Sequence, residues 1–450
     1  MLCSLRCSAA GRRPNVVFIL ADDLGWGQLG CYGSDFYLTP NIDRLAFEGM
    51  RFTNAYAAAP VCSPTRASIM TGKYPARLHL TDFIKGGDPP EGSRLDHPDW
   101  RPHLPLEEVT LAEALKAEGY ATAYFGKWHL SEEKTPPQSL PLNPDKQGFD
   151  ESFVTYKPSQ GLAREWQTPE GDGHNVELIT GKALDFLDRH SDGPFFLFLG
   201  HNTIHNPLME SEGRIARYRD APGAERPENH PVIAAMLERL DESVGAIVER
   251  LETLELGRDT VVVFFSDNGG LEKEADQTPL RSGKASLYEG GIRVPMIVRW
   301  PGKVRAGAVC HEPVCSIDFF PTLLALAGSG QPPENIDGIS LVPHLMESKS
   351  LPERALFWHY PHYHSAGEGP CAAIRRGDYK LIEWYEKSLL DRDGAVELYY
   401  LASDVSESRD LSREMPDRAR EMLSELNAWR NRVNAQLPEV RKSDVSKGSR

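Results

Sequence analysis

The sequence has few cysteines, and their spacing does not suggest a covalent framework. Seven cysteines occur in 450 residues, and no two of them form a C-x-x-C pair. Small disulfide-built folds and cysteine-rich zinc sites need denser or more regular spacing, so the sequence argues against both. Cys310 and Cys315 are near enough along the chain to pair, but two buried thiols are the preferred interpretation.

Long apolar runs are also missing. A helix that spans a bilayer needs about 20 apolar residues. No segment of the sequence approaches that length, so we expect no membrane span. The N-terminal residues carry Arg6, Arg12 and Arg13 but lack the apolar core of roughly 7–15 residues that a secretory signal requires. Either the protein is not exported, or the sequence begins without its leader.

Basic residues are outnumbered by acidic ones. Lys and Arg total 50 against 65 Asp and Glu, which gives a net charge of −15. A negative surface repels polyanions, so we expect no nucleic-acid or broad anionic-membrane binding. An anionic substrate would then need a locally positive pocket. Otherwise the composition, with 40% hydrophobic and 26% charged residues, is that of a globular chain with room for a large domain and a smaller one.

Five short apolar runs have the length and the β-branched or aromatic content of strands buried on both faces. They cover 15–20, 121–125, 195–199, 260–265 and 294–299. Segments with helical periodicity alternate with them, at 41–48, 110–118, 176–190, 232–254 and 317–327. This alternation predicts an α/β fold with a large, mostly parallel sheet sandwiched by helices.

The pattern changes near residue 350. Short strand-like segments at 355–358, 372–376, 379–384 and 397–400 precede a helical segment at 416–433. They predict a smaller C-terminal antiparallel sheet plus helix. The expected organisation is an N-terminal extension at 1–14, the main α/β domain at 15–350, a C-terminal α+β subdomain at 351–436 and a tail at 437–450.

Acidic and amide side chains follow two of the predicted strands. Asp22 and Asp23 come after the first strand, and Asp267 and Asn268 after the strand at 260–265. Ligands of open parallel sheets bind beyond the carboxyl ends of the strands. Three carboxylates and an amide oxygen are hard ligands that suit Ca²⁺ or Mg²⁺. Alone, an Asp-Asp pair after a strand is more often a turn or a helix cap, so this prediction depends on the four residues meeting.

Basic and imidazole side chains flank three other predicted strands. Lys127 and His129 follow the second strand, His201 and His205 follow the third, and Lys284 precedes the last. Taken singly, a lysine fits the solvated surface and a histidine a structural role. Gathered at one sheet edge, they would supply proton carriers and the positive charge that an anionic substrate needs.

Cys62-Ser63-Pro64-Thr65-Arg66 lies between two hydrophobic segments and has the form C-x-P-x-R. By itself, a buried cysteine before a helix is the commoner interpretation. The run resembles the signature of the sulfatase family, in the alkaline phosphatase superfamily. The likeness extends over nearly the whole chain, in the segments NVVFILADDLGWGQLGCYG, TPNIDRLAFEGMRFTNAYAAAPVCSPTRASIMTGKYP, GKWHL, SDNGG and GKASLYEGGIRVP. It is similar above all to the branch of arylsulfatase A and the N-acetylgalactosamine-sulfatases.

This resemblance implies a sulfuric ester hydrolase that depends on another protein. A formylglycine-generating maturation enzyme would oxidise Cys62 to Cα-formylglycine, an aldehyde whose hydrate is the nucleophile. A divalent cation, Ca²⁺ or alternatively Mg²⁺, would be held by the modified Cys62 together with Asp22, Asp23, Asp267 and Asn268.

The resemblance also implies roles for the basic residues. Arg66 and Lys127 would orient the hydrate, and Lys284 and His205 would hold the sulfate. His205 would in addition protonate the departing alcohol, and His129 would serve the release step. We prefer His205 to His201 because His205-Asn206-Pro207 matches the H-x-P of the family.

The substrate implied is a sulfated small molecule or saccharide, with a saccharide favoured, and the implied location is periplasmic or secreted. Two alternatives are a phosphate mono- or diester hydrolase of the same superfamily and an inactive relative that binds sulfated glycans. The segment Trp358–His364, rich in aromatic and imidazole groups, would either contact a sugar ring or pack at a domain interface. Trp26, Tyr32 and Asp82 are further candidates for the entrance.

Overall fold

The computed structural model describes residues 13–132, 140–156, 172–329, 333–390 and 392–441. Within them, the central element is a sheet of eight strands in the order β10-β2-β9-β8-β1-β7-β5-β6. Its strands are β1 (Asn15–Ala21), β2 (Met50–Phe52), β5 (Ala121–Gly126), β6 (Glu151–Val154), β7 (Phe195–Gly200), β8 (Thr260–Ser266), β9 (Met296–Arg299) and β10 (Ala308–Cys310). Neighbours run in parallel except at β9, which is antiparallel to β2 and β8. The predicted mostly parallel sheet is confirmed.

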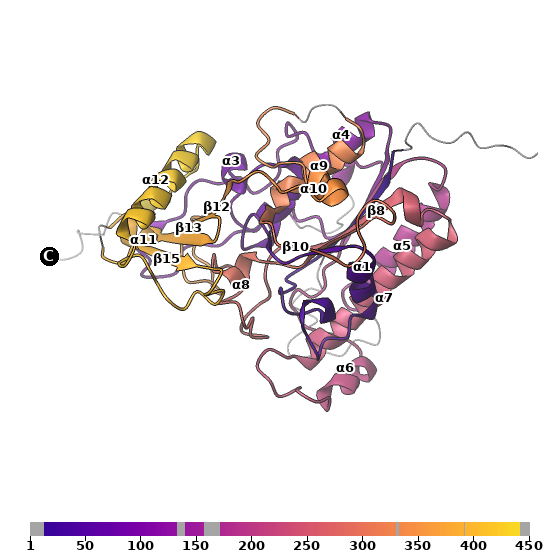
Figure 1. Ribbon diagram of the computed structural model, residues 1–450, viewed down its shortest axis with the longest axis horizontal. Helices are drawn as coiled ribbons and strands as arrows, with labels where there is room; N and C mark the ends of the chain where they lie inside the picture. Colours follow the sequence, from indigo (N-terminus) through magenta and orange to yellow (C-terminus); the bar gives the residue numbers. More distant parts are fainter. Residues whose placement is uncertain (1–12, 133–139, 157–171, 330–332, 391, 442–450) are drawn as a thin grey trace, which may run out of the picture.

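Helices cover both faces of this sheet, because alternate side chains of the strands face two separate cores. Phe18 of β1 belongs to one core and Ile19 to the other. The first face is covered by α2 (Cys62–Thr71), α4 (Leu111–Ala117), α9 (Phe319–Leu326) and α10 (Val342–Glu347). The second is covered by α1 (Pro40–Glu48), α5 (Val176–Arg189), α6 (Glu212–Arg219) and α7 (Pro231–Thr253). Figure 1 shows the two groups of helices on either side of β8.

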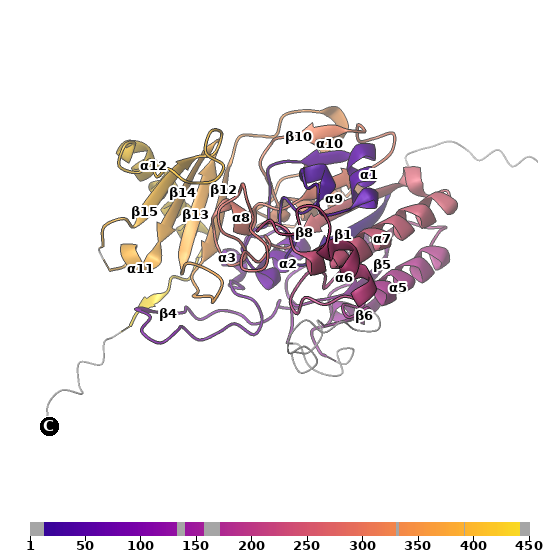
Figure 2. The same ribbon diagram turned by 90° about the horizontal axis from the view of Figure 1, so that it is seen from below.

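A smaller antiparallel sheet follows in the chain, as predicted. Its order is β12-β13-β14-β15, and a third core joins it to the last helix, α12. The elements are β12 (Ala355–Tyr360), β13 (Cys371–Arg376), β14 (Tyr379–Trp384), α11 (Tyr385–Ser388), β15 (Val396–Tyr400) and α12 (Pro416–Val433). Figure 2 shows this unit at the end of the molecule opposite α5 and α7.

Short elements complete the fold. The strands β3 (Ala55–Tyr56) and β11 (Val314–Cys315) pair in parallel, and β4 (Leu95–Asp96) pairs with β16 (Glu439–Val440). Two further helical turns are α3 (Pro75–Leu78) and α8 (Glu289–Ile292). The 3₁₀ turns are Gly30–Tyr32, Pro144–Lys146, Gly257–Asp259 and Ser316–Asp318.

The structure differs from the sequence-based expectations in local ways. The pairing of β16 lies inside the segment expected to be a tail. Cys62 does not precede a helix but is itself the first residue of α2. Most of the expected N-terminal extension, residues 1–12, lies outside the described residues. Among the described helices, none is both long and apolar enough to cross a bilayer.

One buried ammonium joins the two parts of the molecule. Lys380 of β14 lies 2.9 Å from Glu289 of α8 and 2.8 Å from Glu407, and all three side chains are inaccessible to solvent. The Glu289 amide also donates to Glu407 at 2.6 Å. Removing one member of a buried ion pair leaves an uncompensated charge, which is costly in a low-dielectric interior.

We therefore predict that Lys380→Met lowers the free energy of unfolding by about 3–5 kcal/mol, measured by urea denaturation followed through tryptophan fluorescence. The matched control is Lys349→Met, because Lys349 pairs with Glu347 but its side chain is 66% exposed. An exposed pair contributes about 0–1 kcal/mol. Equal losses in the two variants would contradict a stabilising role for the buried lysine.

Candidate active site

The carboxyl ends of β1 and β8 bring the four predicted oxygen ligands together. The two strands pair with Ala21 opposite Ser266, so the residues that follow each strand are neighbours. The Asp23 amide donates to Asp267 Oδ1 at 3.2 Å, and Asn268 Nδ2 donates to Asp23 Oδ1 at 2.8 Å. Asp22 follows β1 directly and is fully buried.

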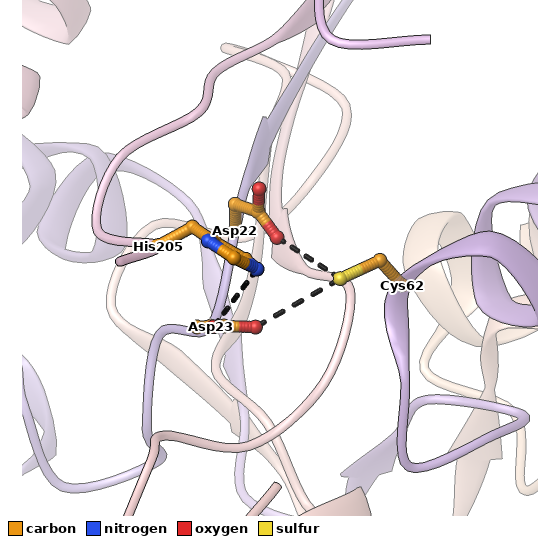
Figure 3. Close-up of side chains that lie close together, drawn as sticks. All are labelled: Asp22, Asp23, Cys62 and His205. Carbon is orange, nitrogen blue, oxygen red and sulfur yellow. Dashed lines mark hydrogen bonds and ion pairs between the residues drawn. The ribbon is translucent and has the colours of Figure 1, made fainter. Parts of the chain in front are cut away.

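Cys62 faces this group from the first residue of α2. Its Sγ lies 3.3 Å from Asp22 Oδ1 and 3.9 Å from Asp23 Oδ1. Figure 3 shows the sulfur directed toward the two carboxylates, with His205 beside them. The first amides of a helix have no partner within the helix and favour anions, so this position suits a group that meets a negatively charged substrate.

Three buried cations accompany the three carboxylates. Lys127 Nζ lies 2.6 Å from Asp22 Oδ2, and Lys284 Nζ lies 2.8 Å from Asp23 and 3.8 Å from Cys62 Sγ. Arg66 Nε donates to Asp267 Oδ2 at 2.8 Å, and its Nη1 donates to the Lys127 carbonyl at 2.6 Å. The three cations offset the charge of the carboxylates. The offset is incomplete at Asp267, because burial and then Asp22 raise its pKa to about 7.

The electrostatic environment keeps the thiol protonated. Burial, followed by the carboxylates of Asp22 and Asp267, raises the pKa of Cys62 well above its usual value. Burial alone would also raise the pKa of Asp22. Lys127, then His205 and Arg66, outweigh burial and hold the pKa of Asp22 well below its usual range. A thiol attacks as its thiolate, so Cys62 in this form is not an activated nucleophile.

His205 joins the site, and His201 does not. The Asp22 amide donates to the Thr203 carbonyl at 2.8 Å, and the Ile204 amide donates back to the Asp22 carbonyl at 2.6 Å. These bonds hold the loop that follows β7 against the end of β1. His205 Nε2 in this loop lies 3.8 Å from Asp23 Oδ2. His201 is fully buried, and burial lowers its pKa to about 3. Burial, then Lys284, lowers the pKa of His205 to a similar value, so position and not pKa separates the two histidines.

His129 reaches the same region from the end of β5. Its Nε2 contacts the Ile84 carbonyl, which only accepts, so Nε2 carries the proton and the lone pair lies on Nδ1. Burial, then Lys127, lowers the pKa of His129 well below its usual value. The neutral ring is therefore in the form that takes up a proton. Sequence reasoning missed Ile84, because a backbone carbonyl leaves no side-chain signal.

The segment Trp358–His364 divides between two roles. Trp358 is buried and donates to the Ala57 carbonyl at 2.8 Å, and the hydroxyl of buried Tyr360 donates to Asp82 at 3.0 Å. These residues pack at an interface. His364 is only half-buried, and its ring meets that of Phe83, next to Ile84, whose amide donates to Ser63 Oγ beside Cys62. Burial, then Lys284, lowers the pKa of His364 to about 4.

Two further entrance candidates lie elsewhere. The hydroxyl of buried Tyr32 lies 2.8 Å from the Phe52 carbonyl and 2.9 Å from the Met296 carbonyl, and Trp26 lines a separate cavity.

The oxygen donors fit a hard cation. Carboxylates of Asp22, Asp23 and Asp267 converge with Asn268, whose Oδ1 is buried and accepts no hydrogen bond from a described residue. A buried amide oxygen without a donor is costly, and a cation would satisfy it. Asp22, Asp23, Cys62 and His205 also have ligand atoms within 4.8 Å of one another.

Comparison with known proteins gives a consistent result. The family model described as sulfatase matches residues 14–329, and a model described as N-sulphoglucosamine sulphohydrolase, C-terminal, matches residues 282–432. Human arylsulfatase A is 35% identical over 404 residues, which cover 83% of this chain and 75% of that protein. The chain belongs to the sulfatase family. Its enzymatic class, sulfuric ester hydrolase, follows from that membership.

Other relatives of this sulfatase give the same family assignment. Human N-acetylgalactosamine-6-sulfatase is 34% identical over 399 residues, covering 78% of this chain and 69% of that protein. The crystal structure of Ps i-CgsB in complex with k-i-k-neocarrahexaose superposes with a TM-score of 0.75 at 30% identity and covers 93% of both chains. The fold of this sulfatase is thus that of its solved relatives.

The donor set predicts that Ca²⁺ stabilises this sulfatase. A ligand that binds the folded state alone raises the melting temperature, so Ca²⁺ should raise it in the wild type. Asn268→Ala removes one oxygen ligand and should weaken Ca²⁺ binding at least about tenfold, measured by thermal shift across a Ca²⁺ titration.

Asn15→Ala is the matched control. Asn15 is also a buried asparagine whose Oδ1 has no donor among the described residues, but it lies at the opposite end of the strands, at the start of β1. This variant should keep the wild-type Ca²⁺ response. A Ca²⁺ response that is the same in Asn268→Ala and the wild type would refute the assignment of Asn268 as a ligand.

Proposed function

We propose that this sulfatase hydrolyses a sulfate monoester of a saccharide through Cys62 converted to Cα-formylglycine, with a divalent cation bound beside it. The observation that carries the proposal is the position of Cys62 Sγ, 3.3 Å from Asp22 and 3.8 Å from Lys284. A side-chain atom there faces both the oxygen ligands of a cation and an ammonium that suits a sulfate oxygen.

The cation would be held by Asp22, Asp23, Asp267, Asn268 and the modified Cys62. Ca²⁺ suits this set of carboxylate and amide oxygens, with Mg²⁺ as the alternative. When bound, it would neutralise negative charge on the sulfate oxygens. The formylglycine hydrate supplies an oxygen nucleophile for sulfur.

The chain's own residues would bind the sulfate and keep the reacting groups in place. Lys284 and His205 both contact the Asp23 carboxylate and would hold the sulfate oxygens. Lys127 and Arg66 are fixed to Asp22 and Asp267, and would orient the residue at position 62. Since all these side chains are held by hydrogen bonds or ion pairs, little reorganisation is needed as charge develops.

Two histidines would move the protons. His205 would donate a proton to the departing alcohol from Nε2, which lies 3.8 Å from Asp23. Burial, then Lys284, lowers the pKa of His205 to about 3, and the negative charge of a bound sulfate would raise it. His129 would accept a proton in the release step, at Nδ1, because its Nε2 is tied to the Ile84 carbonyl.

Phosphate ester hydrolysis is the competing activity, because the same cation and lysines would also hold a phosphate. An inactive glycan-binding relative is a weaker alternative, because the structure retains every predicted charged group around Cys62.

The function is tested by maturation and by substrate preference. We expect peptide mass spectrometry to detect an aldehyde at position 62 after coexpression with a formylglycine-generating enzyme, and a thiol without it.

The matured protein should hydrolyse aryl sulfate with a higher kcat/KM than aryl phosphate. Cys62→Ala should abolish turnover, because it removes the nucleophile. Cys310→Ala, at a buried cysteine in β10, should not.

A thiol that persists at position 62 in active protein would exclude formylglycine as the nucleophile. A large preference for aryl phosphate would instead select the phosphate ester hydrolase.

Phe83 and His364 form the wall that would receive the sugar ring. Both side chains are half-buried, and their rings meet edge to face with centroids 5.4 Å apart. The Ile84 amide donates to Ser63 Oγ at 3.1 Å, which fixes this segment beside Cys62. An aromatic face suits the apolar face of a sugar.

A carboxylate lies beside the turn that carries Lys284. Glu368 accepts from the Ser282 hydroxyl at 2.6 Å. Negative charge here would repel additional anionic groups, so we expect a ring with a single sulfate as the preferred substrate.

Phe83→Ala should lower kcat/KM for N-acetylgalactosamine 6-sulfate about tenfold, equivalent to about 1.4 kcal/mol of lost transition-state binding. Phe47→Ala is the control, because Phe47 is 76% exposed on α1. Inhibition by inorganic sulfate should be unchanged in both variants. If Phe83→Ala weakened inhibition by inorganic sulfate as much as it lowered kcat/KM for the sugar sulfate, Phe83 would act by positioning the charged site. The assignment of Phe83 to a sugar-binding wall would then be wrong.

A further inference from the structure

A second cavity lies between the main sheet and the C-terminal sheet. Its volume is about 350 Å³, and its lining includes Trp26, Thr53 and Asn54 from the main domain and Asp378 and Leu401 from the C-terminal sheet. None of the residues assigned to the Cys62 site lines it.

Positive charge is concentrated in this cavity. Arg51, Arg293 and Arg375 line it together with His311, and the one carboxylate among the lining residues is that of Asp378, whose side chain is 54% exposed. The whole chain has the opposite balance, with 50 basic against 65 acidic residues. A local excess of arginines in an acidic protein is expected where an anion binds.

The arginines keep donors available. Arg51 lies over the Tyr32 ring, 5.1 Å from its centroid, and forms no hydrogen bond or ion pair with a described residue. Arg293 donates through Nε to the Thr53 carbonyl at 2.8 Å and through Nη1 to Glu289, which leaves Nη2 without a described partner. His311 uses only Nδ1, 2.8 Å from Thr53 Oγ1.

The cavity is also held in shape by its surroundings. Arg293 lies over the Trp26 ring, 5.0 Å from the centroid, and Trp26 Nε1 donates to the Thr53 carbonyl at 3.2 Å. Arg375 contacts the Tyr56 hydroxyl and donates to the Gly377 carbonyl at 2.9 Å. Donors fixed by such contacts lose little entropy when they bind a ligand.

We propose that this cavity is a second anion site, which binds a sulfate or carboxylate group through Arg51, Arg293 and His311. The group belongs either to a free inorganic anion or to an anionic saccharide. Thr53 follows β2, two strands from β8 in the sheet, so the cavity is about 10 Å from the end of β8 at the usual strand spacing. A saccharide longer than one unit could therefore reach both sites.

Selenate tests the site directly, because its selenium is located by anomalous diffraction and its shape is that of sulfate. Crystals of the wild type soaked in selenate should show a peak between Arg51, Arg293 and His311. Arg51→Gln should lose that peak. Arg44→Gln, at an exposed arginine of α1 paired with Glu48, should keep it. A wild-type crystal with selenate only at the Cys62 site, or a peak that survives in Arg51→Gln, would overturn the proposal.

Kinetics then distinguish the two sources of the anion. If the ligand is a saccharide, Arg51→Gln should raise KM about five- to tenfold for a disulfated oligosaccharide and leave KM for a monosulfated monosaccharide unchanged. If the ligand is a free anion, both KM values should stay at the wild-type level while the selenate peak is lost. The diffraction result does not depend on turnover, so it stands or fails separately from the proposed sulfatase mechanism.

Discussion

Charge compensation among buried side chains is the constraint on which the site depends. Asp22 and Asp267 sit at the ends of adjacent strands, where their repulsion would oppose folding if no cations were present. Lys127 and Arg66 supply these cations from β5 and α2, and Lys284 does the same for Asp23. The groups that would bind a sulfate are therefore the ones that allow the strand ends to pack.

The same principle links the site to the C-terminal sheet. Glu289 of α8 lies five residues after Lys284, and its carboxylate pairs with Lys380 of β14. The Tyr56 hydroxyl donates to Glu289 at 2.7 Å and is itself contacted by Arg375. The C-terminal sheet thus fixes the segment that carries Lys284, and the loop after β12 carries His364 of the proposed sugar-binding wall. It is a structural component of the active region rather than an appendage.

The sequence predicted the parts of the fold that depend on local patterns. Apolar runs located β1, β5, β7 and β8, and the residues after β1 and β8 formed the oxygen cluster because parallel strands end at one edge. Periodicity did not predict the antiparallel direction of β9, since a buried strand has the same composition in either direction. The Ile84 carbonyl, Phe83 and the arginine cavity were not foreseen, because each depends on contacts between segments far apart in the sequence.

The burial of Cys62 limits when it can be modified. Its side chain is 1% exposed, it lies in the first turn of α2, and its sulfur is surrounded by Asp22, Asp23 and Lys284. An enzyme that oxidises this side chain would need access to it, and a residue that is 1% exposed in the folded structure offers little. If the proposed conversion occurs, it therefore precedes the packing of α2 against the sheet. The charge network would then form around a position 62 that is already formylglycine.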